Sequence, residues 1–326
     1  MIVGQDRAVE QFASAWTSRR LHHAWLLAGP KGVGKATFAH AAARRVLADA
    51  AGPPSELPGI GTSDDHPIVK LIEAGSHPDM RWLERLPKEK GEGLARDITV
   101  DQVRGLGEFM GMTAALSPWR VAVIDSMDEL NREASNALLK MLEEPPPNTI
   151  FFLVSHAPGR LLPTIRSRCR LVQFDQLDDD AMTSILEAQS PEVSAAERKR
   201  IVGMSFGSAG RALAFAQLGL AKLEEAAVAI IRQGDPTNAR RAELANDLGK
   251  KASADRYAAF LELAPSLIAR EARSLRGAAL ERALDAYAKT RELAAVAPRV
   301  SLDAAATVFQ IGGFLASVPE QRSLKH

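Results

Sequence analysis

Three apolar runs in the first half of the chain have the length of buried strands: residues 23–28, 119–125 and 149–155. None of them alternates strictly between apolar and polar side chains, which is typical of strands covered on both faces of a parallel sheet. Between the second and third runs, apolar side chains recur at helical spacing over residues 127–144, and three prolines from Pro145 end this helix. Strands that alternate with helices predict a doubly wound parallel α/β sheet.

The pattern changes beyond about residue 174, where strand signals disappear. Residues 177–189 and 194–204 have helical periodicity, another helix resumes after residues 208–211, and from about residue 220 the chain is rich in Ala, Leu, Arg and Glu and amphipathic. The predicted domains are an α/β nucleotide-binding domain (1–174), a small helical lid (175–218) and an all-α C-terminal domain (219–326).

Composition narrows the class of protein. A chain of 326 residues is too long for one ordinary core. Its net charge of +1 excludes a chain that is basic throughout, so any contact with nucleic acid must be local or shared with partners. The single cysteine, Cys169, excludes a disulfide scaffold and a Cys-rich zinc site. The sequence has no run of 18 or more apolar residues and no signal-peptide pattern at its start, so we expect a cytoplasmic protein without a membrane segment.

The segment after the first predicted strand has the pattern of a phosphate-binding loop, and it precedes an Ala-rich helix. Backbone N–H groups around Gly32 and Gly34 can point at phosphate oxygens. Lys35 adds a full positive charge to the partial charge of the helix N-terminus. The residues expected to contact a nucleotide here are Gly29, Lys31, Gly32, Val33, Gly34, Lys35, Ala36 and Thr37.

Two positions of the nucleotide site are altered. The loop pattern requires a hydroxyl after Lys35 to hold Mg²⁺, but the chain has Ala36, and Thr37 lies about 100° further round the helix. Asp125 ends a predicted strand, where a carboxylate can hold Mg²⁺ through water; the alternative is that it only caps the next helix. Ser126 follows it, at the place where related ATPases carry a glutamate that orients the attacking water.

No other carboxylate is predicted to take over this role. Asp128 and Glu129 lie on the following turn, and their position predicts that both face away from the site. A serine hydroxyl is a poor base, so Ser126 does not replace the glutamate. We therefore expect weak to moderate binding of ATP or ADP with little Mg²⁺-dependent hydrolysis, and no active ATPase in the isolated chain.

Four arginines lie within residues 160–170. A solvated basic surface accounts for Arg160 and Arg170. Arg168 lies between a serine and a cysteine in a stretch expected to lead away from the sheet, and a rigidly held arginine can reach into a neighbour's phosphate site. The residues alone leave the basic surface and the arginine finger equally open.

Several motifs together resemble clamp-loader AAA+ ATPases. Residues 121–145 resemble the Walker B strand and the following helix of this family, and Ser167-Arg-Cys169 matches its Ser-Arg-Cys motif. Residues 2–5 (Ile-Val-Gly-Gln) resemble its adenine-side segment, Ser155 ends a strand at the sensor 1 position, and residues 207–211 resemble the sensor 2 motif.

The resemblance implies roles that the pattern alone leaves open. Arg168 would act in trans as an arginine finger, Val3 would lie on the adenine side, Ser155 would be sensor 1 and Arg211 would reach the γ-phosphate from the lid. The fold would be an AAA+ domain, a helical lid and a C-terminal collar that joins a heteropentamer; the alternative for the amphipathic collar helices is a private core. The resemblance covers residues 1–215 well and the remainder only in helical character.

Within that family, the altered positions resemble a non-catalytic stator subunit. Motor subunits carry the loop hydroxyl, the glutamate and a four-cysteine zinc module; here residues 49–67 form an insertion without cysteine, and His66 and His77 alone cannot form a tetrahedral zinc site. We therefore expect no zinc and no metal ligands. The implied partners are motor (gamma/tau-type) and delta-type subunits and, through the complex, a sliding clamp and primed DNA. An active motor ATPase and a free-standing DNA-binding ATPase are the alternatives, and the charge of +1 disfavours the second.

Overall fold

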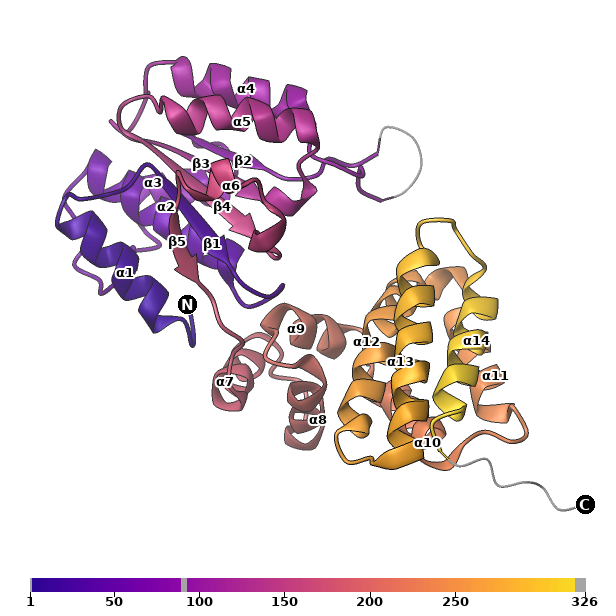
Figure 1. Ribbon diagram of the computed structural model, residues 1–326. Coiled ribbons are helices and arrows are strands. Elements are labelled where there is room, and N and C mark those ends of the chain that lie inside the picture. Colours follow the sequence, from indigo (N-terminus) through magenta and orange to yellow (C-terminus); the bar gives the residue numbers. More distant parts are fainter. Residues whose placement is uncertain (1, 89–92, 320–326) are drawn as a thin grey trace, which may run out of the picture. The chain divides into compact units, whose positions relative to one another are not determined.

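The computed structural model describes residues 2–88 and 93–319, which form two compact units that divide after Ala181 (Figure 1). The first unit contains α1 (Asp6–Thr17), β1 (Ala24–Ala28), α2 (Lys35–Ala51), α3 (Pro67–Glu73), β2 (Met80–Leu83), α4 (Val100–Gly111), β3 (Arg120–Asp125), the 3-10 turn η1 (Met127–Glu129), α5 (Arg132–Glu143), β4 (Thr149–Ser155), η2 (Pro158–Arg160), α6 (Pro163–Arg166) and β5 (Arg170–Gln173).

Helix α7 (Asp179–Gln189) begins in the first unit and ends in the second. The other elements of the second unit are α8 (Ala195–Ser205), α9 (Ala209–Gln217), α10 (Ala221–Gln233), α11 (Ala239–Leu248), η3 (Lys251–Ser253), α12 (Ala254–Ala272), α13 (Gly277–Val296) and α14 (Ala304–Ala316). The predicted boundaries of a separate lid and collar stay a prediction. No helix in the described part of the chain is long and apolar enough to cross a membrane.

The sheet has the strand order β2-β3-β4-β1-β5, and every pair of neighbouring strands is parallel. This confirms the predicted parallel α/β sheet. Ala28 at the end of β1 pairs with Ser155 at the end of β4, and Asp125 at the end of β3 pairs with Val154. The carboxyl ends of the three central strands therefore meet at one edge, which is where parallel sheets bind ligands.

Helices cover both faces of this sheet, which explains why the strands are apolar throughout. Trp25, Leu27 and Phe152 pack against α1 and α2, whereas Leu26 and Phe151 pack on the other face with α4 and α5. All of these side chains are buried. Successive strand residues point to opposite faces, so a strand between two helical layers must be apolar at every position.

Two elements differ from the sequence prediction. The stretch after α6 was expected to lead away from the sheet, but residues 170–173 form β5, which pairs with β1. Only Val172 of this edge strand is buried, so it carries no apolar run. The single helix expected over 127–144 is divided into η1 and α5, because Asn131 caps α5 by accepting a hydrogen bond from the Ala134 backbone N–H (2.8 Å).

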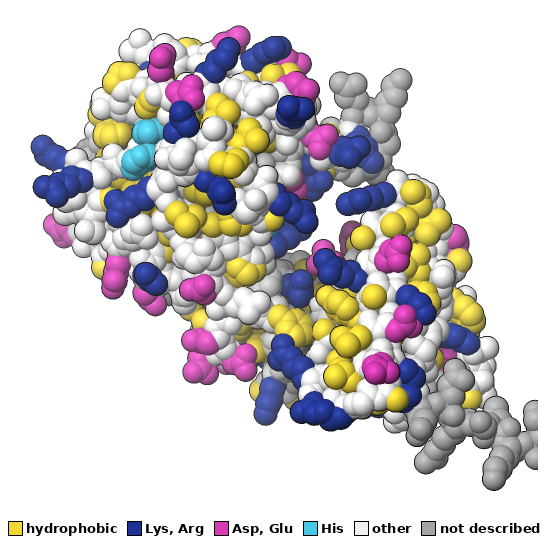
Figure 2. All heavy atoms as spheres, in the orientation of Figure 1, with side chains coloured by type: hydrophobic (Ala, Val, Ile, Leu, Met, Phe, Trp, Pro, Cys, Tyr) yellow, Lys and Arg dark blue, Asp and Glu magenta, His cyan; other side chains and the backbone are white. Residues whose placement is uncertain are grey.

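The described part of the second unit is helical throughout, and α11 packs closely on α14. A Cβ on Gly249 would lie 2.6 Å from Ala305 Cβ, and one on Gly312 would lie 2.5 Å from Arg241 Cβ. Glycine therefore permits the close approach of these helices. On the visible face of the helical unit, hydrophobic side chains lie between charged ones (Figure 2).

Candidate nucleotide site

The phosphate-binding loop connects β1 to α2 at the carboxyl edge of the sheet. Gly29 has φ +153°, and a Cβ there would lie 2.2 Å from the Phe174 carbonyl oxygen, so no other residue fits. Gly34 has φ +98°, precedes the first residue of α2 and has open space where a Cβ would point. The backbone at the start of α2 can therefore approach a phosphate group closely.

Lys35 is almost fully buried, with 3% of its surface exposed. Its Nζ donates a hydrogen bond to the Gly29 carbonyl oxygen (2.7 Å) and another to the Pro30 carbonyl oxygen. Burial lowers the pKa of Lys35 to about 8, although Asp125 and Asp128 oppose this shift. The ammonium group thus lies at the loop and close to both carboxylates.

Asp125 ends β3 next to the loop, as predicted for the Walker B position. Burial raises the pKa of its carboxyl group, and the negative charges of Glu129 and Glu84 raise it further, while Lys35 lowers it. Glu129 also forms an ion pair with Arg85 (Oε2 to Nε, 2.9 Å). The carboxylate of Glu129 is therefore paired with Arg85, and its direction away from the site stays a prediction.

The prediction that Asp128 faces away is wrong. Its carboxylate accepts hydrogen bonds from Ser155 Oγ (3.0 Å) and from the backbone N–H groups of His156 (2.5 Å) and Ala157 (3.1 Å). Asp128 thereby joins the end of β3 to the end of β4. With three donors on one carboxylate, Asp128 has a structural task and is not available to activate water.

The residues present do not complete a magnesium site. Ala36 offers no oxygen, Thr37 is exposed on the helix, and Ser126 is buried with its Oγ unpartnered among the described residues. In the described ranges, no group of three or more His, Cys, Asp or Glu side chains is arranged to hold a metal ion. Asp125 is the one predicted metal-site residue whose side chain supplies a suitable carboxylate.

His156 belongs to this site although the sequence analysis did not select it. It directly follows Ser155, whose carbonyl oxygen accepts a hydrogen bond from the Gly29 N–H (3.3 Å). Its Nδ1 is buried without a hydrogen-bond partner in the described part of the chain. Burial lowers the pKa of His156, and the positive charge of Lys35 lowers it further. Its place directly after Ser155, the residue expected to be sensor 1, was the signal available in the sequence.

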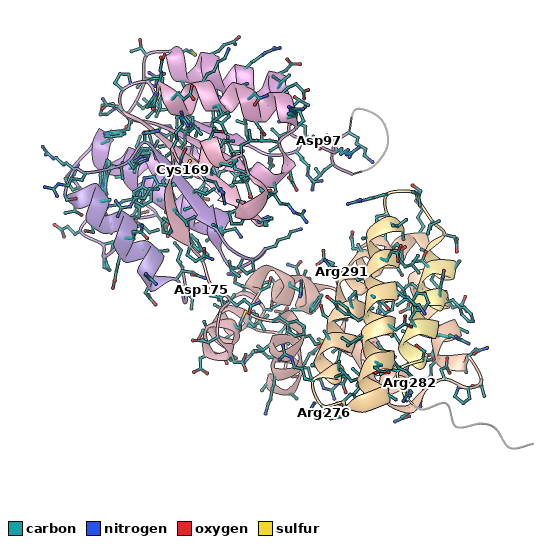
Figure 3. All side chains as sticks on the ribbon, viewed as in Figure 1. Asp97, Cys169, Asp175, Arg276, Arg282 and Arg291 are labelled. Atoms are coloured by element: carbon teal, nitrogen blue, oxygen red, sulfur yellow. The ribbon has the colours of Figure 1, made fainter. Side chains whose placement is uncertain are left out.

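The N-terminal segment lies beside the same loop. The side-chain amide of Gln5 donates hydrogen bonds to the carbonyl oxygens of Val33 (3.2 Å) and Asp175 (2.9 Å), and Gln5 is buried. Asp175 lies where the chain leaves the sheet (Figure 3). Val3 is half-buried two residues earlier, so the segment assigned to the adenine side is held next to the phosphate-binding loop.

Arg168 lies on the surface just after α6. Its guanidinium group forms an ion pair with Glu143 (Nη2 to Oε1, 2.9 Å) and donates to the Thr164 carbonyl oxygen (2.9 Å). The side chain is 35% exposed. Among the described residues, its contacts are with its own turn and with α5, and none is with the phosphate-binding loop.

Arg211 belongs to the second unit. It lies half-buried near the start of α9, where the Ser208 Oγ accepts a hydrogen bond from the Arg211 backbone N–H (3.3 Å). Its role as sensor 2 stays a prediction.

Comparison with known proteins identifies relatives that match between 45% and 64% of this chain. Residues 4–178 match a family model described as "DNA polymerase III, delta subunit". The chain is 41% identical over 147 residues to DNA polymerase III subunit delta' of Pseudomonas aeruginosa, covering 45% of this chain and 41% of that protein. It is 33% identical over 210 residues to subunit delta' of Escherichia coli, covering 64% of this chain and 58% of that protein.

A solved structure resembles a larger part of the chain. A gamma-subunit-related protein of DNA polymerase III from Thermotoga maritima aligns with 94% of this chain and 98% of its own, with 16% identity and a TM-score of 0.44. The sequence matches described above cover about half of each relative's length. Because the family model spans more than half of the chain, the chain belongs to the DNA polymerase III delta-subunit family.

Proposed function

We propose that the chain is the delta-prime, or stator, subunit of the DNA polymerase III clamp loader and assists ATP-driven loading of the sliding clamp on primed DNA. One observation carries this proposal: the Ser-Arg-Cys motif presents Arg168 at the surface, while the chain's own nucleotide site lacks two catalytic groups. The names of the Pseudomonas and Escherichia relatives agree with it. The chain then belongs to the polymerase holoenzyme without being an ATPase by itself.

The nucleotide site supports binding of ATP or ADP. The loop backbone around Gly34 is open to a phosphate, and Lys35 lies where a phosphate would replace its contacts with backbone carbonyl groups. The negative charge of a bound phosphate would favour the charged form of this buried lysine. Weak to moderate nucleotide binding is therefore part of the proposal.

Efficient hydrolysis is disfavoured at the same site. Water activation needs a base within hydrogen-bond reach of the attacking water. Ser126 cannot act as that base, Asp128 holds the end of β4, and Glu129 is paired with Arg85. The alternative function, a gamma/tau-like motor ATPase, requires groups that these positions do not supply.

Arg168 is suited to act on a neighbouring subunit. Its contact with Glu143 is an exposed ion pair, which costs little to exchange for a phosphate group. A guanidinium group is the side chain that best pairs with phosphate oxygens. We propose that Arg168 leaves Glu143 and contacts the nucleotide of a motor subunit, and that helices α10–α14 join a pentameric collar with motor and delta subunits.

The experiment that tests the proposal is the Arg168→Ala variant in a loader reconstituted from this chain with motor and delta subunits. The complex should still assemble, and turnover at the one motor site served by Arg168 should fall by about 10³-fold or more in the presence of clamp and primed DNA. Arg170→Ala is the matched control, because Arg170 stacks on Trp25 (4.9 Å) and should leave turnover unchanged. Unchanged turnover with Arg168→Ala would remove the finger from the proposal.

A second experiment separates the stator from the motor. The isolated chain should bind ADP and ATP in calorimetry at millimolar nucleotide but show almost no ATPase activity. A strong ATPase activity that is lost in Lys35→Ala would identify a motor subunit instead.

A further inference from the structure

We propose that this chain holds the terminal phosphate of its nucleotide with the His156 side chain and Lys35, without requiring Mg²⁺. The proposal rests on the nucleotide binding proposed above and names the groups that would replace the metal. The ligand class is a nucleoside triphosphate or diphosphate. His156 would contact the γ-phosphate and therefore favour the triphosphate.

The strand register places His156 at the phosphate end of the site. Ser155 pairs with Ala28, the residue before the loop, and Gly29 donates its N–H to the Ser155 carbonyl oxygen (3.3 Å). His156 therefore follows a residue that is bonded directly to the first residue of the loop. In the sheet order, β4 lies between β1 and β3, so His156 lies between the loop and Asp125. The γ-phosphate of a nucleotide in a phosphate-binding loop occupies this region.

The backbone of His156 is fixed while its ring keeps one unpartnered nitrogen. The N–H of His156 donates to Asp128, which also accepts a hydrogen bond from Ser155 Oγ. The buried Nδ1 has no hydrogen-bond partner in the described part of the chain, and a buried polar atom without a partner is costly. Because protein atoms cover Nδ1 in the free chain, the ring must turn for a phosphate oxygen to reach it, and the imidazole must then carry a proton on Nδ1.

The charges around His156 agree with an anion-binding position. Lys35 and Lys31 both contribute positive potential at the ring, and Asp128 is the opposing carboxylate. Asp128 is itself committed to three hydrogen-bond donors. In the free chain the positive charges of the two lysines disfavour a proton on His156. The negative charge of a bound phosphate would balance those charges, so a bound triphosphate and protonated His156 stabilise each other.

The altered metal position also favours phosphate binding by side-chain cations. In a standard loop the hydroxyl after the lysine holds the Mg²⁺ that neutralises the β- and γ-phosphates. Ala36 removes that ligand here, and Thr37 is exposed on the helix. Side-chain cations and the loop N–H groups must then carry more of the phosphate charge, and Lys35 and His156 are the groups placed to do so.

The test is calorimetry of ATP and ADP on the full chain, each with Mg²⁺ and with EDTA. The affinity for ATP should change by less than about threefold between the two conditions, since the metal lacks one protein ligand. His156→Ala should weaken ATP about tenfold and ADP less than about threefold, which is the size expected for one lost hydrogen bond to a charged group. His156→Gln, which keeps a donor, should recover part of the ATP affinity. His40→Ala, at a histidine further along α2 beside Glu73, is the matched control and should change neither affinity.

Each outcome distinguishes this inference from the function on which it rests. ATP binding that is lost in EDTA and restored by Mg²⁺ overturns the inference and leaves the nucleotide site in place. Equal losses of ATP and ADP affinity in His156→Ala, with a lowered melting temperature and no recovery in His156→Gln, mean that the ring only supports the fold, and this also overturns it. Absence of binding by either nucleotide in every condition removes the proposed nucleotide site itself.

Discussion

Arg168 and Cys169 are neighbours in the Ser-Arg-Cys motif, but the fold gives their side chains opposite properties. The Arg168 guanidinium group lies at the surface beside Glu143. The Cys169 thiol points inward to the Ile165 carbonyl oxygen (Sγ to O, 3.1 Å), and burial raises its pKa to about 12 (Figure 3). A thiol in this environment is unreactive, so the chemistry of the motif belongs to the arginine.

His77 illustrates how a buried residue sets a pH limit on the fold. It is 3% exposed, its Nδ1 accepts a hydrogen bond from the Asp79 N–H (3.0 Å), and its Nε2 is unpartnered within the described residues. Burial lowers the pKa of His77, although Asp79 opposes the shift. The charged ring is therefore disfavoured in the folded chain.

This gives a prediction for stability against pH. Because the folded pKa of His77 lies below the unfolded value of about 6.5, the unfolded chain binds the proton more readily, and stability falls as the pH drops below about 6.5. Burial and the neighbouring His22 also lower the pKa of His23, which acts in the same direction. The urea midpoint should fall from pH 7 towards pH 5, and His77→Gln should reduce that fall. An equally steep fall in His77→Gln would assign the acid sensitivity to other groups.

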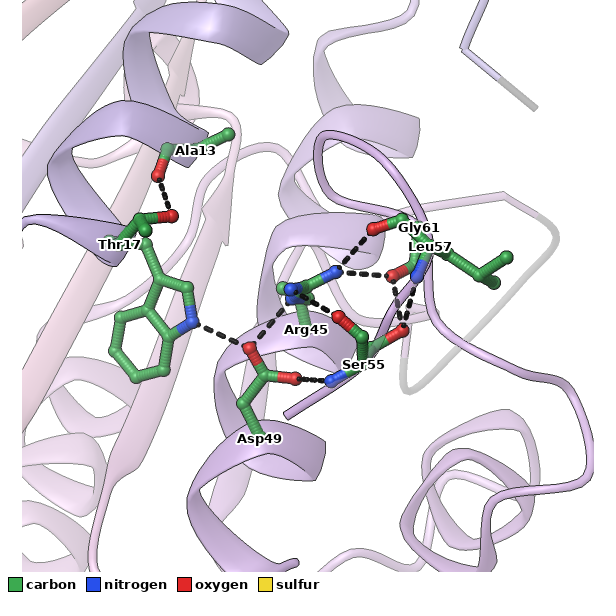
Figure 4. A network of polar contacts seen from close by, with 8 residues as sticks. Ala13, Thr17, Arg45, Asp49, Ser55, Leu57 and Gly61 are labelled. Carbon is green, nitrogen blue, oxygen red and sulfur yellow. Dashed lines mark hydrogen bonds and ion pairs between the residues drawn. The ribbon is translucent and has the colours of Figure 1, made fainter. Parts of the chain in front are cut away.

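At the scale of elements, a polar network on α2 holds the cysteine-free insertion (Figure 4). Arg45 donates to the carbonyl oxygens of Ser55 (2.8 Å), Leu57 (2.8 Å) and Gly61 (2.9 Å), and it pairs with Asp49 (2.7 Å). Asp49 in turn accepts the Ser55 N–H (2.7 Å). One guanidinium group thereby binds three points of the insertion.

Arg45→Ala should loosen this insertion. The Arg45 and Asp49 side chains are only 11% and 6% exposed. Removing the arginine leaves the buried Asp49 carboxylate without its counter-charge, with only the Ser55 N–H and Trp16 Nε1–H still donating to it, and takes one donor from each of three carbonyl groups. We expect a loss of about 3 kcal/mol in unfolding free energy and faster proteolysis within the insertion. Arg44→Ala is the control: its partners Asp64 and Glu73 are 92% and 54% exposed, so the loss should stay below about 1 kcal/mol. Equal losses in the two variants would contradict this reading of the network.

The contact between α11 and α14 allows a paired glycine test. Gly312→Ala would place a Cβ 2.5 Å from Arg241 Cβ and should cost about 1–3 kcal/mol of unfolding free energy, because the helices must separate. Gly203→Ala in α8 meets nothing within 4 Å and should stabilise the chain by about 0.4–1 kcal/mol. Chemical denaturation of both variants measures the difference. A stabilising Gly312→Ala would mean that these helices are not in close contact.

At the scale of the whole molecule, the helical unit exposes several large apolar side chains, which a collar would use in assembly. They are Leu284, Val296, Val300, Leu302 and Phe309.

Leu284→Lys tests whether this surface serves assembly. Leu284 is 55% exposed, so the change should alter the stability of the isolated chain by less than about 0.5 kcal/mol. Co-purification with motor and delta subunits should fall at least about tenfold, because an interface would have to bury the lysine charge. Leu57→Lys, at a leucine of the first unit that is 47% exposed, is the control. Full recovery of the complex with Leu284→Lys would place the collar contact elsewhere on the helical unit.

Much of the first unit could be predicted because its signals are local. Gly29, Gly34 and Lys35 are recognisable by spacing alone, and an unbroken apolar run predicts a strand that is buried on both faces. Strand β5 could not be predicted in this way, because an edge strand with one buried residue lacks that signal. For the helical unit, the periodicity of the sequence predicted helices but not their packing, since amphipathic faces do not specify which helices pair.

Local spacing in the sequence determined the phosphate-binding loop, the absent hydroxyl at Ala36, the absent glutamate at Ser126 and the three apolar central strands. The tertiary structure decided where charges meet. It turned Asp128 onto the end of β4, paired Glu129 with Arg85 and brought His156 to the loop. The physical reason is that strand register joins residues 127 positions apart, such as Ala28 and Ser155, and the direction of a side chain at such a junction depends on contacts that no local pattern encodes.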